Sequence, residues 1–376
     1  MAALLTTVSA AHAFAQGLPH TAFRFANVAD NTKDFSQFSG FPAINNRGAV
    51  AFQALGAEFT DGIFRWQDGK VSPVATGADS LILFGLDPAI NDVGVIAYEA
   101  NLDSQTRAIF TNDGVATKTI VNSTEQGLFG RFFGSPSINI WGTVAFFAAR
   151  NGLASEAVFA GNGGPLSVIA DTQNSNFADF QNVAINALGK IVFVADTNDG
   201  NEGLFVMSTR RGRDGELEVV PNGAVDIVDT TNPDFVGFGD PAINAFGIVA
   251  DEAFRADRNI EVLSGDRRKV TARTDVTKDV FLEIEHPSIN DEGAVAFFAI
   301  REDGSNVILL EATGGDKPIP VIQTGDQLFG SQVTTLDLGR FALNDRFQMA
   351  FQYTLQDGRT GVAVASLTGT NQRQEN

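Results

Sequence analysis

The sequence predicts an all-β protein, a single seven-bladed β-propeller over residues 20–370. Three observations carry this prediction: a hairpin motif that recurs seven times, four short apolar runs in six of the seven periods, and an unusual aromatic content. The chain has 38 Gly and 32 Phe but only two Trp and two Tyr, as expected for many tight turns around a Phe-filled core. An open β-solenoid of hairpin units is the alternative architecture.

The N-terminal segment, residues 1–16, has the apolar run and the small-residue end of a secretory signal peptide. Ala13-Phe14-Ala15 reads as its cleavage motif, although no Lys or Arg precedes Arg24. The segment predicts export, to a secreted, periplasmic or cell-surface location. No other stretch approaches the 18 apolar residues of a membrane span, and residues 371–376 form a polar tail.

The hairpin motif is clearest in FPAINNRGAVAF, residues 41–52. Its Asn recurs every 46 to 58 residues, as Asn45, Asn91, Asn139, Asn186, Asn244, Asn290 and Asn344. Three residues later stands a Gly in six copies and Phe347 in the last. Asn and Gly favour a turn, because Asn caps it with its side chain and Gly supplies positive φ. The pair that follows, such as Ala51-Phe52, is predicted to pack blade against blade, but the fifth copy has Ala250-Asp251.

Each repeat has the composition of a four-stranded blade. A short strand such as Pro-Ala-Ile precedes the turn, an alternating strand follows it, and a third apolar run such as GIFRW comes next. Six repeats add a fourth run, such as VSPVA, but the seventh stops after its third. A strand expected at residues 22–28 fills this gap, so that the two chain ends complete one blade and no free sheet edge remains.

The repeated motif resembles a tandem-repeat family of exported bacterial proteins, described by its Asn-x-x-Gly-x-x-Ala-Phe pattern. Six copies in this chain match the Asn and the Gly, over nearly the whole length. The repeat is also similar to that of TolB-type β-propellers, in which the turn is Ser-Pro-Asp-Gly; here it is, for example, Asn-Asp-Val-Gly. The first resemblance implies an exported repeat protein and supplies no catalytic residues.

Composition excludes several classes of function. The net charge of −19 argues against nucleic acid or an anionic membrane as partner, since phosphate binding needs a basic patch. The absence of Cys excludes disulfides, thiol catalysis and zinc–thiolate sites. We expect a cofactor-free acidic protein that meets a glycan or a protein.

The candidate ligand-binding residues stand four positions before each Asn, where we expect the inner strand to begin. This position varies beside the most repeated motif, as a site requires: Phe41, Asp87, Ser135, Asn182, Asp240, His286 and Arg340. Asp87, Asp240, His286 and Arg340 are predicted to converge at the channel mouth. The alternative is that all seven are separate solvated residues at strand starts.

His286 is the candidate catalytic residue, as a general base, or a metal ligand, because Glu283 and Glu285 flank it. Calcium is the one cofactor that the pattern allows. Carboxylates in Asp-Gly turns between second and third strands, at Asp61, Asp199, Asp303 and Asp357, are its weak candidates, beside Asp103 and Asp257. Asp-Gly is also a good solvated turn in its own right.

Three hypotheses of function follow. The leading one is an exported, non-enzymatic scaffold that holds a glycan or protein partner on its acidic channel face. The second is a propeller enzyme, a hydrolase or lyase acting on a carbohydrate or ester at the channel mouth. The third is a self-assembling matrix or filament subunit.

Overall fold

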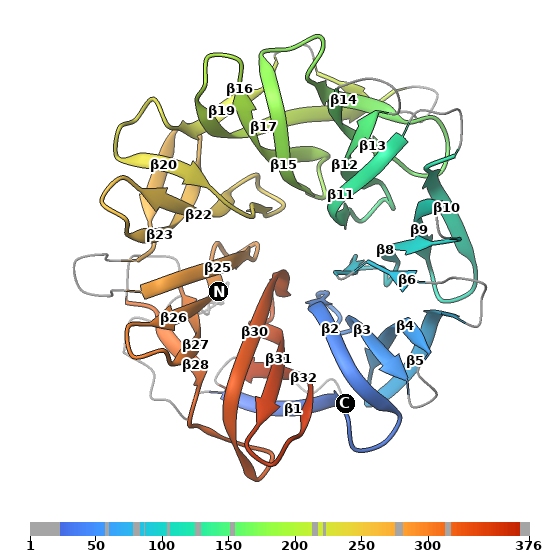
Figure 1. Cartoon of the computed structure of the whole chain (residues 1–376), viewed down its shortest axis with the longest axis vertical. Coiled ribbons are helices and arrows are strands. Elements are labelled where there is room, and N and C mark those ends of the chain that lie inside the picture. The colour runs from blue at the N-terminus through green and yellow to red at the C-terminus, as the bar shows by residue number, and fades with distance from the viewer. Residues whose placement is uncertain are drawn as a thin grey trace, which may run out of the picture.

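The computed structural model describes residues 23–56, 60–77, 83–85, 87–103, 106–124, 129–150, 155–212, 217–220, 223–274, 281–312 and 317–368. The predicted signal peptide and polar tail lie outside these residues and remain predictions. The described residues form strands joined by turns and loops, in seven sheets. The sheets stand around a central axis, and the chain visits them in order, beginning and ending in the same sheet (Figure 1). The predicted seven-bladed β-propeller is confirmed.

The blades are numbered in chain order, and their strands are given in the order of the sequence, except that β1 comes last in blade 7. Blades 1 to 3 contain β2 (Phe35–Ile44), β3 (Val50–Gly56), β4 (Asp61–Gln67) and β5 (Lys70–Thr76); β6 (Leu83–Phe84), β7 (Ala89–Ile90), β8 (Ile96–Asn101), β9 (Arg107–Asn112) and β10 (Thr117–Asn122); and β11 (Phe129–Ile138), β12 (Val144–Arg150), β13 (Glu156–Gly161) and β14 (Ser167–Asp171). Blades 4 and 5 contain β15 (Phe177–Ile185), β16 (Lys190–Thr197), β17 (Glu202–Arg211), β18 (Leu217–Val219) and β19 (Val225–Asp229); and β20 (Phe235–Phe238), β21 (Ala242–Ile243), β22 (Val249–Arg255), β23 (Ile260–Asp266) and β24 (Lys269–Ala272). Blades 6 and 7 contain β25 (Phe281–Ile289), β26 (Val295–Arg301), β27 (Asn306–Glu311) and β28 (Ile319–Gln323); and β29 (Gln327–Leu328), β30 (Ser331–Leu343), β31 (Gln348–Leu355), β32 (Thr360–Leu367) and β1 (Phe23–Asp30).

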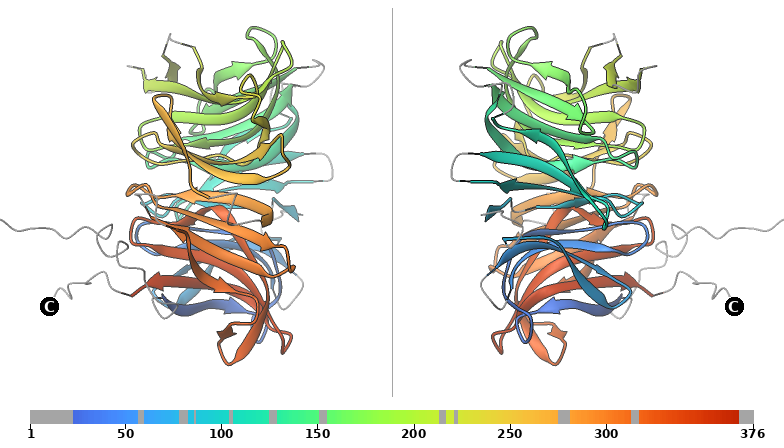
Figure 2. Two further views of the ribbon diagram at one scale, coloured as in Figure 1. Left: turned by 90° about the vertical axis from the view of Figure 1, so that its left-hand side faces the viewer. Right: turned by 90° about the vertical axis from the view of Figure 1, so that its right-hand side faces the viewer.

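The two ends of the described chain meet in blade 7, as predicted. Strand β1 pairs antiparallel with β32 from Phe23 opposite Leu367 to Asp30 opposite Gly361. The blue first strand therefore lies beside the red last strands in all three views (Figures 1 and 2). This pairing closes the ring and covers the edge that β32 would otherwise expose.

The repeated turn sets one face of the disc. The Gly of each turn has a positive φ, from +75° at Gly142 to +91° at Gly94, which a residue with a Cβ adopts only with strain. Phe347 takes the same conformation at φ +55°, and its buried side chain packs in the core of blades 6 and 7. We call the face that carries the seven Asn turns the turn face; the loops between second and third strands lie on the opposite face.

The core lies between blades. Six aromatic side chains after the turns are fully buried: Phe52, Tyr98, Phe146, Phe193, Phe297 and Phe351. Each packs on small residues of the blade before it, as Phe52 packs against Ala350 of blade 7, so the predicted blade-to-blade packing is confirmed. In blade 5, Asp251 occupies this position and is completely buried.

The start of the inner strand differs from the prediction. We expected it four residues before each Asn, but β2 already begins at Phe35 and β30 at Ser331. The strand is interrupted by a bulge, seen in blade 1 as a register shift between Ser39 and Ala43. Gly and Pro at the bulge break the alternating pattern of apolar and polar residues. The first half of the strand was therefore not predicted from the sequence.

Candidate functional site

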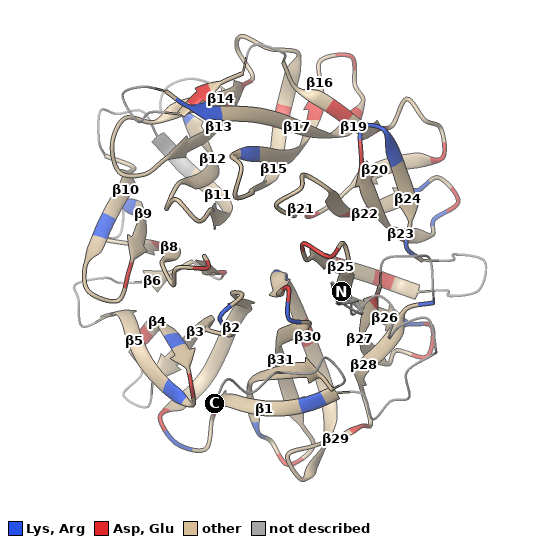
Figure 3. Cartoon of the chain, turned by 180° about the vertical axis from the view of Figure 1, so that it is seen from behind, with Lys and Arg blue, Asp and Glu red and all other residues tan. Residues whose placement is uncertain are grey.

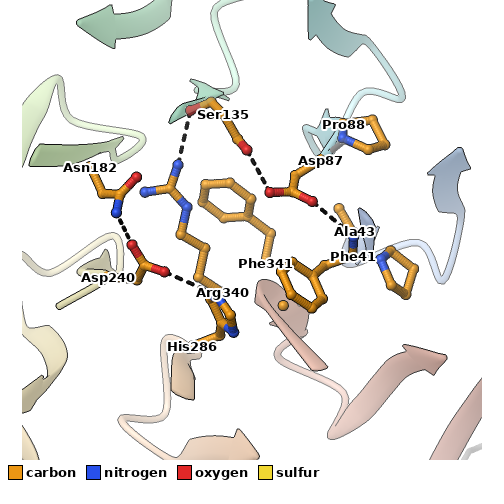
Figure 4. A pocket seen from close by; sticks show the side chains of 12 residues that line it. Phe41, Ala43, Asp87, Pro88, Ser135, Asn182, Asp240, His286, Arg340 and Phe341 are labelled. Atoms are coloured by element: carbon orange, nitrogen blue, oxygen red, sulfur yellow. Dashed lines mark hydrogen bonds and ion pairs between the residues drawn. The ribbon is translucent and has the colours of Figure 1, made fainter. Parts of the chain in front are cut away.

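The seven variable residues line one small cavity inside the central channel. We call Phe41, Asp87, Ser135, Asn182, Asp240, His286 and Arg340 the channel ring; the structure brings all seven together (Figure 4). They sit on the bulges of the inner strands or, in blades 2 and 5, in the break between two short inner strands. The ring therefore lies within the channel, at interruptions of the inner strands. This differs from the prediction, which placed these residues at strand starts and at the channel mouth.

The bulges depend on unusual backbone conformations. Gly40 and Gly134, which precede Phe41 and Ser135, have φ values of +64° and +65°, and His286 itself has φ +53°. A left-handed His is uncommon, and such strain often marks a position whose side-chain direction matters. Here it turns the imidazole of His286 into the channel (Figure 4).

One half of the ring is organised by Asp87. Its Oδ1 accepts a hydrogen bond from the backbone N–H of Phe41 at 2.9 Å, and its Oδ2 accepts one from the hydroxyl of Ser135 at 2.6 Å. These bonds join blades 1, 2 and 3 across the channel wall.

The other half is organised by Asp240. Its carboxylate accepts a hydrogen bond from the Asn182 amide and forms an ion pair with Nε2 of His286 at 2.9 Å. Burial lowers the pKa of His286, but the hydrogen bond and charge of Asp240 outweigh burial and raise it. Burial raises the pKa of Asp240, but the bond to His286 and the charge of Arg340 outweigh it, so this pKa is lowered. Both shifts favour the charged pair.

Arg340 crosses the channel and closes it. Its guanidinium donates to the carbonyl oxygens of Val183 and Ser135, both at 2.9 Å, and lies 4.8 Å from the ring centre of Phe341. Burial lowers its pKa, whereas the carboxylates of Asp240 and Asp87 act in the opposite direction. The side chain thus ties blade 7 to blades 3 and 4.

The space left inside the ring is small. The cavity measures about 30 Å³, enough for about one water molecule. Nδ1 of His286 is buried without a hydrogen-bond partner in the described chain, and the nearest carboxylate oxygen, of Glu285, is 3.8 Å away. In this geometry the ring residues bond to one another, and a sugar ring has no room among them.

Two buried acids that we did not predict from the sequence lie behind the ring. Both carboxylate oxygens of Asp251 and Oε2 of Glu252 lack a hydrogen-bond partner among the described residues. Burial and then the charge of Asp240 raise the pKa of Glu252 to about 8, and burial and Glu252 raise that of Asp251 well above its usual range. The sequence signal for these two buried acids was Asp251 itself, which stands where the other repeats have Phe or Tyr.

A second ring, of the turn asparagines, was also missed. In blade 1 the Oδ1 of Asn45 accepts from the N–H groups of Arg47 and Ala49, as expected for a local turn. Its Nδ2 also donates to the carbonyl of Asn91 in the next blade, at 2.9 Å. The same donation to the following blade occurs from Asn91, Asn186, Asn244, Asn290 and Asn344. The motif therefore binds neighbouring blades together as well as forming turns.

The channel opens on the turn face into a cavity of about 180 Å³, which we call the mouth. The residue after each Asn lines it, including the carboxylates of Asp92, Asp291 and Asp345. These carboxylates accept hydrogen bonds from backbone N–H groups of adjacent blades, as Asp345 does from Asp291 at 2.7 Å. Acidic and basic segments meet beside the axis at the inner ends of β25 and β30 (Figure 3).

The calcium candidates do not gather. Asp61, Asp199, Asp303 and Asp357 lie in blades 1, 4, 6 and 7, and three of them bond within their own turns, as Asp303 accepts from the N–H of Ser305 at 2.9 Å. Asp61 accepts from the side chain of Gln53. In the part of the chain that the structure describes, no group of three or more His, Asp or Glu side chains is arranged to hold a metal ion.

Fold and repeat together define a seven-bladed β-propeller built from an asparagine-turn repeat. Residues 17–267 match the family described as "Family of unknown function (DUF7453)", and the chain belongs to this family. No curated protein matches the sequence. Among the described residues, no helix is long and apolar enough to cross a membrane.

Solved structures support the fold. A prolyl endopeptidase aligns with a TM-score of 0.55 and 14% identity, over 88% of this chain and 47% of that one. Prolyl oligopeptidase B from Galerina marginata, bound to a 25mer macrocyclization substrate, aligns at 0.51 and 12%, over 86% and 48%. The chain thus spans about half the length of these two proteins. A putative TolB from Agrobacterium tumefaciens aligns at 0.43 and 11%, over 93% and 98%. At these identities the likeness to the two prolyl peptidases shows the fold alone.

Proposed function

We propose that this chain is an exported, non-enzymatic scaffold that holds a protein partner or a glycan on its turn face, at the acidic mouth of the channel. The contrast between the two cavities carries the proposal. The inner cavity of about 30 Å³ is lined by ring residues that bond to one another and leave little room, whereas the mouth of about 180 Å³ is larger and opens to solvent. A partner reaches polar groups at the mouth without displacing the ring. Rigid scaffolds commonly bind through such loops.

Binding to the mouth is tested with the purified chain on a glycan array and in a displayed library of random peptides. We expect a ligand whose affinity falls at least tenfold in the Asp291→Asn, Asp345→Asn double variant, because the charges vanish while the side-chain amide oxygens still accept from the backbone N–H groups. Asp303→Asn, in an exposed turn of the opposite face, is the matched control. Absence of any glycan or peptide ligand contradicts the proposal.

An enzyme is the second candidate, because the His286–Asp240 pair has the form of an oriented imidazole. Purified chain is screened against polysaccharides and esters, beside His286→Ala and Asp240→Asn. Turnover that both variants lose supports a hydrolase or lyase; turnover that neither loses, or none at all, contradicts it.

A matrix or filament subunit is tested by electron microscopy of the concentrated chain, where only discrete particles would contradict assembly.

The proposal also includes export and a relation of the repeat to exported tandem-repeat proteins. The apolar start and the Asn-x-x-Gly-x-x-Ala-Phe copies support placement among exported tandem-repeat proteins. Expression in a bacterial host is expected to deliver the chain outside the cytoplasm with its first residues removed near Ala15. An unprocessed chain that stays in the cytoplasm contradicts export.

A further inference from the structure

The third residue of each Asn turn points away from the core on the turn face. In blades 2 to 5 this residue is apolar and exposed: Val93 is 50% exposed, Trp141 66%, Leu188 69% and Phe246 70%. We call these four residues the apolar arc. At the same position, blades 6, 7 and 1 carry the exposed charged residues Glu292, Arg346 and Arg47.

The apolar arc has no role in the turn itself. The turn is held by the Asn side chain and by the Gly, and Arg47 in blade 1 shows that a charged residue serves equally well there. A single exposed apolar residue needs no explanation, but four in consecutive blades on one rim form the kind of patch that marks an interaction surface.

The arc is continuous where its largest member lies. The indole N–H of Trp141 donates to the carbonyl of Ala187 in the turn of blade 4, at 3.1 Å, so the ring lies across the boundary between the two blades. Ile140, 39% exposed, adds to the same surface. Trp is the residue most often responsible for binding energy at protein interfaces, and Phe supplies similar apolar area.

The charge beside the arc indicates what the partner carries. Asp92, Asp291 and Asp345 line the mouth that the arc borders, and the chain as a whole has a net charge of −19. On the other side of the rim, Arg47 and Arg346 stand beside Glu292. A cationic side chain extended over the mouth would meet carboxylates, and apolar side chains beside it would meet the arc.

We propose that the turn face binds a polypeptide segment in which apolar side chains, aromatic ones above all, stand next to a Lys or Arg. The apolar residues lie on the arc formed by Val93, Trp141, Leu188 and Phe246, and the cation enters the mouth. This inference rests on the proposed function and names the partner class and the surface that a binding scaffold of this shape uses.

The test uses the full exported chain as bait for a displayed library of random 15-residue peptides. Enriched peptides are expected to combine apolar and cationic residues, and to bind at least tenfold more weakly to the Trp141→Ser, Phe246→Ser double variant. The matched control is Val236→Ser, Leu282→Ser, which removes two residues of similar exposure, 62% and 59%, from inner strands outside the arc. Circular dichroism and thermal unfolding check that both double variants stay folded.

The other outcomes separate this inference from the proposed function. Enrichment of acidic peptides would contradict the proposed partner class but not the proposed function. The same holds for cationic peptides whose affinity is unchanged in the Trp141→Ser, Phe246→Ser double variant. A glycan that stacks on Trp141 does the same. Dimers in light scattering that the arc variant dissociates show that a second copy covers the arc, and also overturn the inference. If neither a peptide nor a glycan binds, both this inference and the proposed function are contradicted.

Discussion

Nε2 of His286 lies 2.9 Å from a carboxylate oxygen of Asp240, and this contact joins blades 5 and 6 inside the channel. Both side chains are largely buried, and each shifts the pKa of the other toward the charged form. The pair explains why the variable residues of blades 5 and 6 are an acid and a base that can hold opposite charges.

Asp240→Asn should lower the pKa of His286. The carboxylate that raises this pKa most is lost, while burial, which lowers it, remains; the largely protonated Glu252, and also Glu285, are the other acids that raise it. The value is expected below the usual imidazole range near ~6.5. NMR titration of a chain without His12 and His20 reports this residue alone, and an unchanged pKa would refute the pairing.

The same pair predicts a pH window for stability. The lowered pKa of Asp240 gives stability that is present above the ordinary carboxyl range and is lost as pH falls through it. The raised pKa of His286 gives stability that is present below the ordinary imidazole range and is lost as pH rises through it. The cost of Asp240→Asn should therefore be largest between about pH 4 and 6.5.

Arg340→Met should destabilise the protein by about 3–5 kcal/mol, because two buried carbonyls lose their donor and Asp87 and Asp240 lose a buried counter-charge. Urea unfolding of the purified variant measures this. Arg210→Met, which removes an exposed ion pair with Glu218, should cost less than about 1 kcal/mol. Equal costs for the two variants would show that Arg340 does not hold the channel closed.

The buried acids of blade 5 predict that stability falls as pH rises. The pKa of Glu252 is raised to about 8, so the folded protein binds a proton that the unfolded chain releases near ~4.3, and stability declines between these values. Glu252→Gln should flatten this slope. Asp251→Leu should stabilise the protein at pH 8 by about 1–3 kcal/mol, since it removes an unpartnered buried group.

Thermal unfolding at pH 5 and pH 8 measures both effects. Glu302→Gln, in an exposed turn, is the control and should leave the slope unchanged. A variant at Glu252 that keeps the full pH dependence would place the titrating group elsewhere.

The two functions of the turn asparagines can be separated at Asn244. Asn244→Asp keeps the oxygen that accepts from Phe246 and Ile248 but loses the donor to Asn290 in blade 6. Asn244→Ala loses both. We expect losses of about 1 kcal/mol for each bond removed, so the Ala variant should unfold at lower urea than the Asp variant. Equal stability of the Asp variant and the wild type would show that the bond between blades contributes nothing.

The sequence was sufficient for the architecture because the information is local. Asn45 and its six equivalents fix the turns, and the missing fourth strand of the last repeat places β1 in blade 7. The convergence of Asp87, Asp240, His286 and Arg340 also follows, since equal positions of equal blades face one axis. Whether such residues bind a ligand or one another depends on the geometry of the bulges. The positive φ values of Gly40 and His286 set this geometry, and the spacing of the repeats does not indicate it.

The features that were missed depend on tertiary contacts. Turn chemistry already accounts for Asn45, so its bond to blade 2 left no separate trace in the sequence. Val93, Trp141, Leu188 and Phe246 look like ordinary members of a repeat that is rich in apolar residues. Only their exposure on a common rim distinguishes them from core residues.

The central claim is that partners bind on the turn face and not inside the channel ring. Hydrogen–deuterium exchange of the full chain, with and without a saturating enriched peptide, tests it directly. Slower exchange is expected in the turns that carry Val93, Trp141, Leu188 and Phe246, with the opposite-face loops at Asp303 and Asp357 unchanged. Protection confined to those loops, or to the inner strands around His286, would contradict the claim.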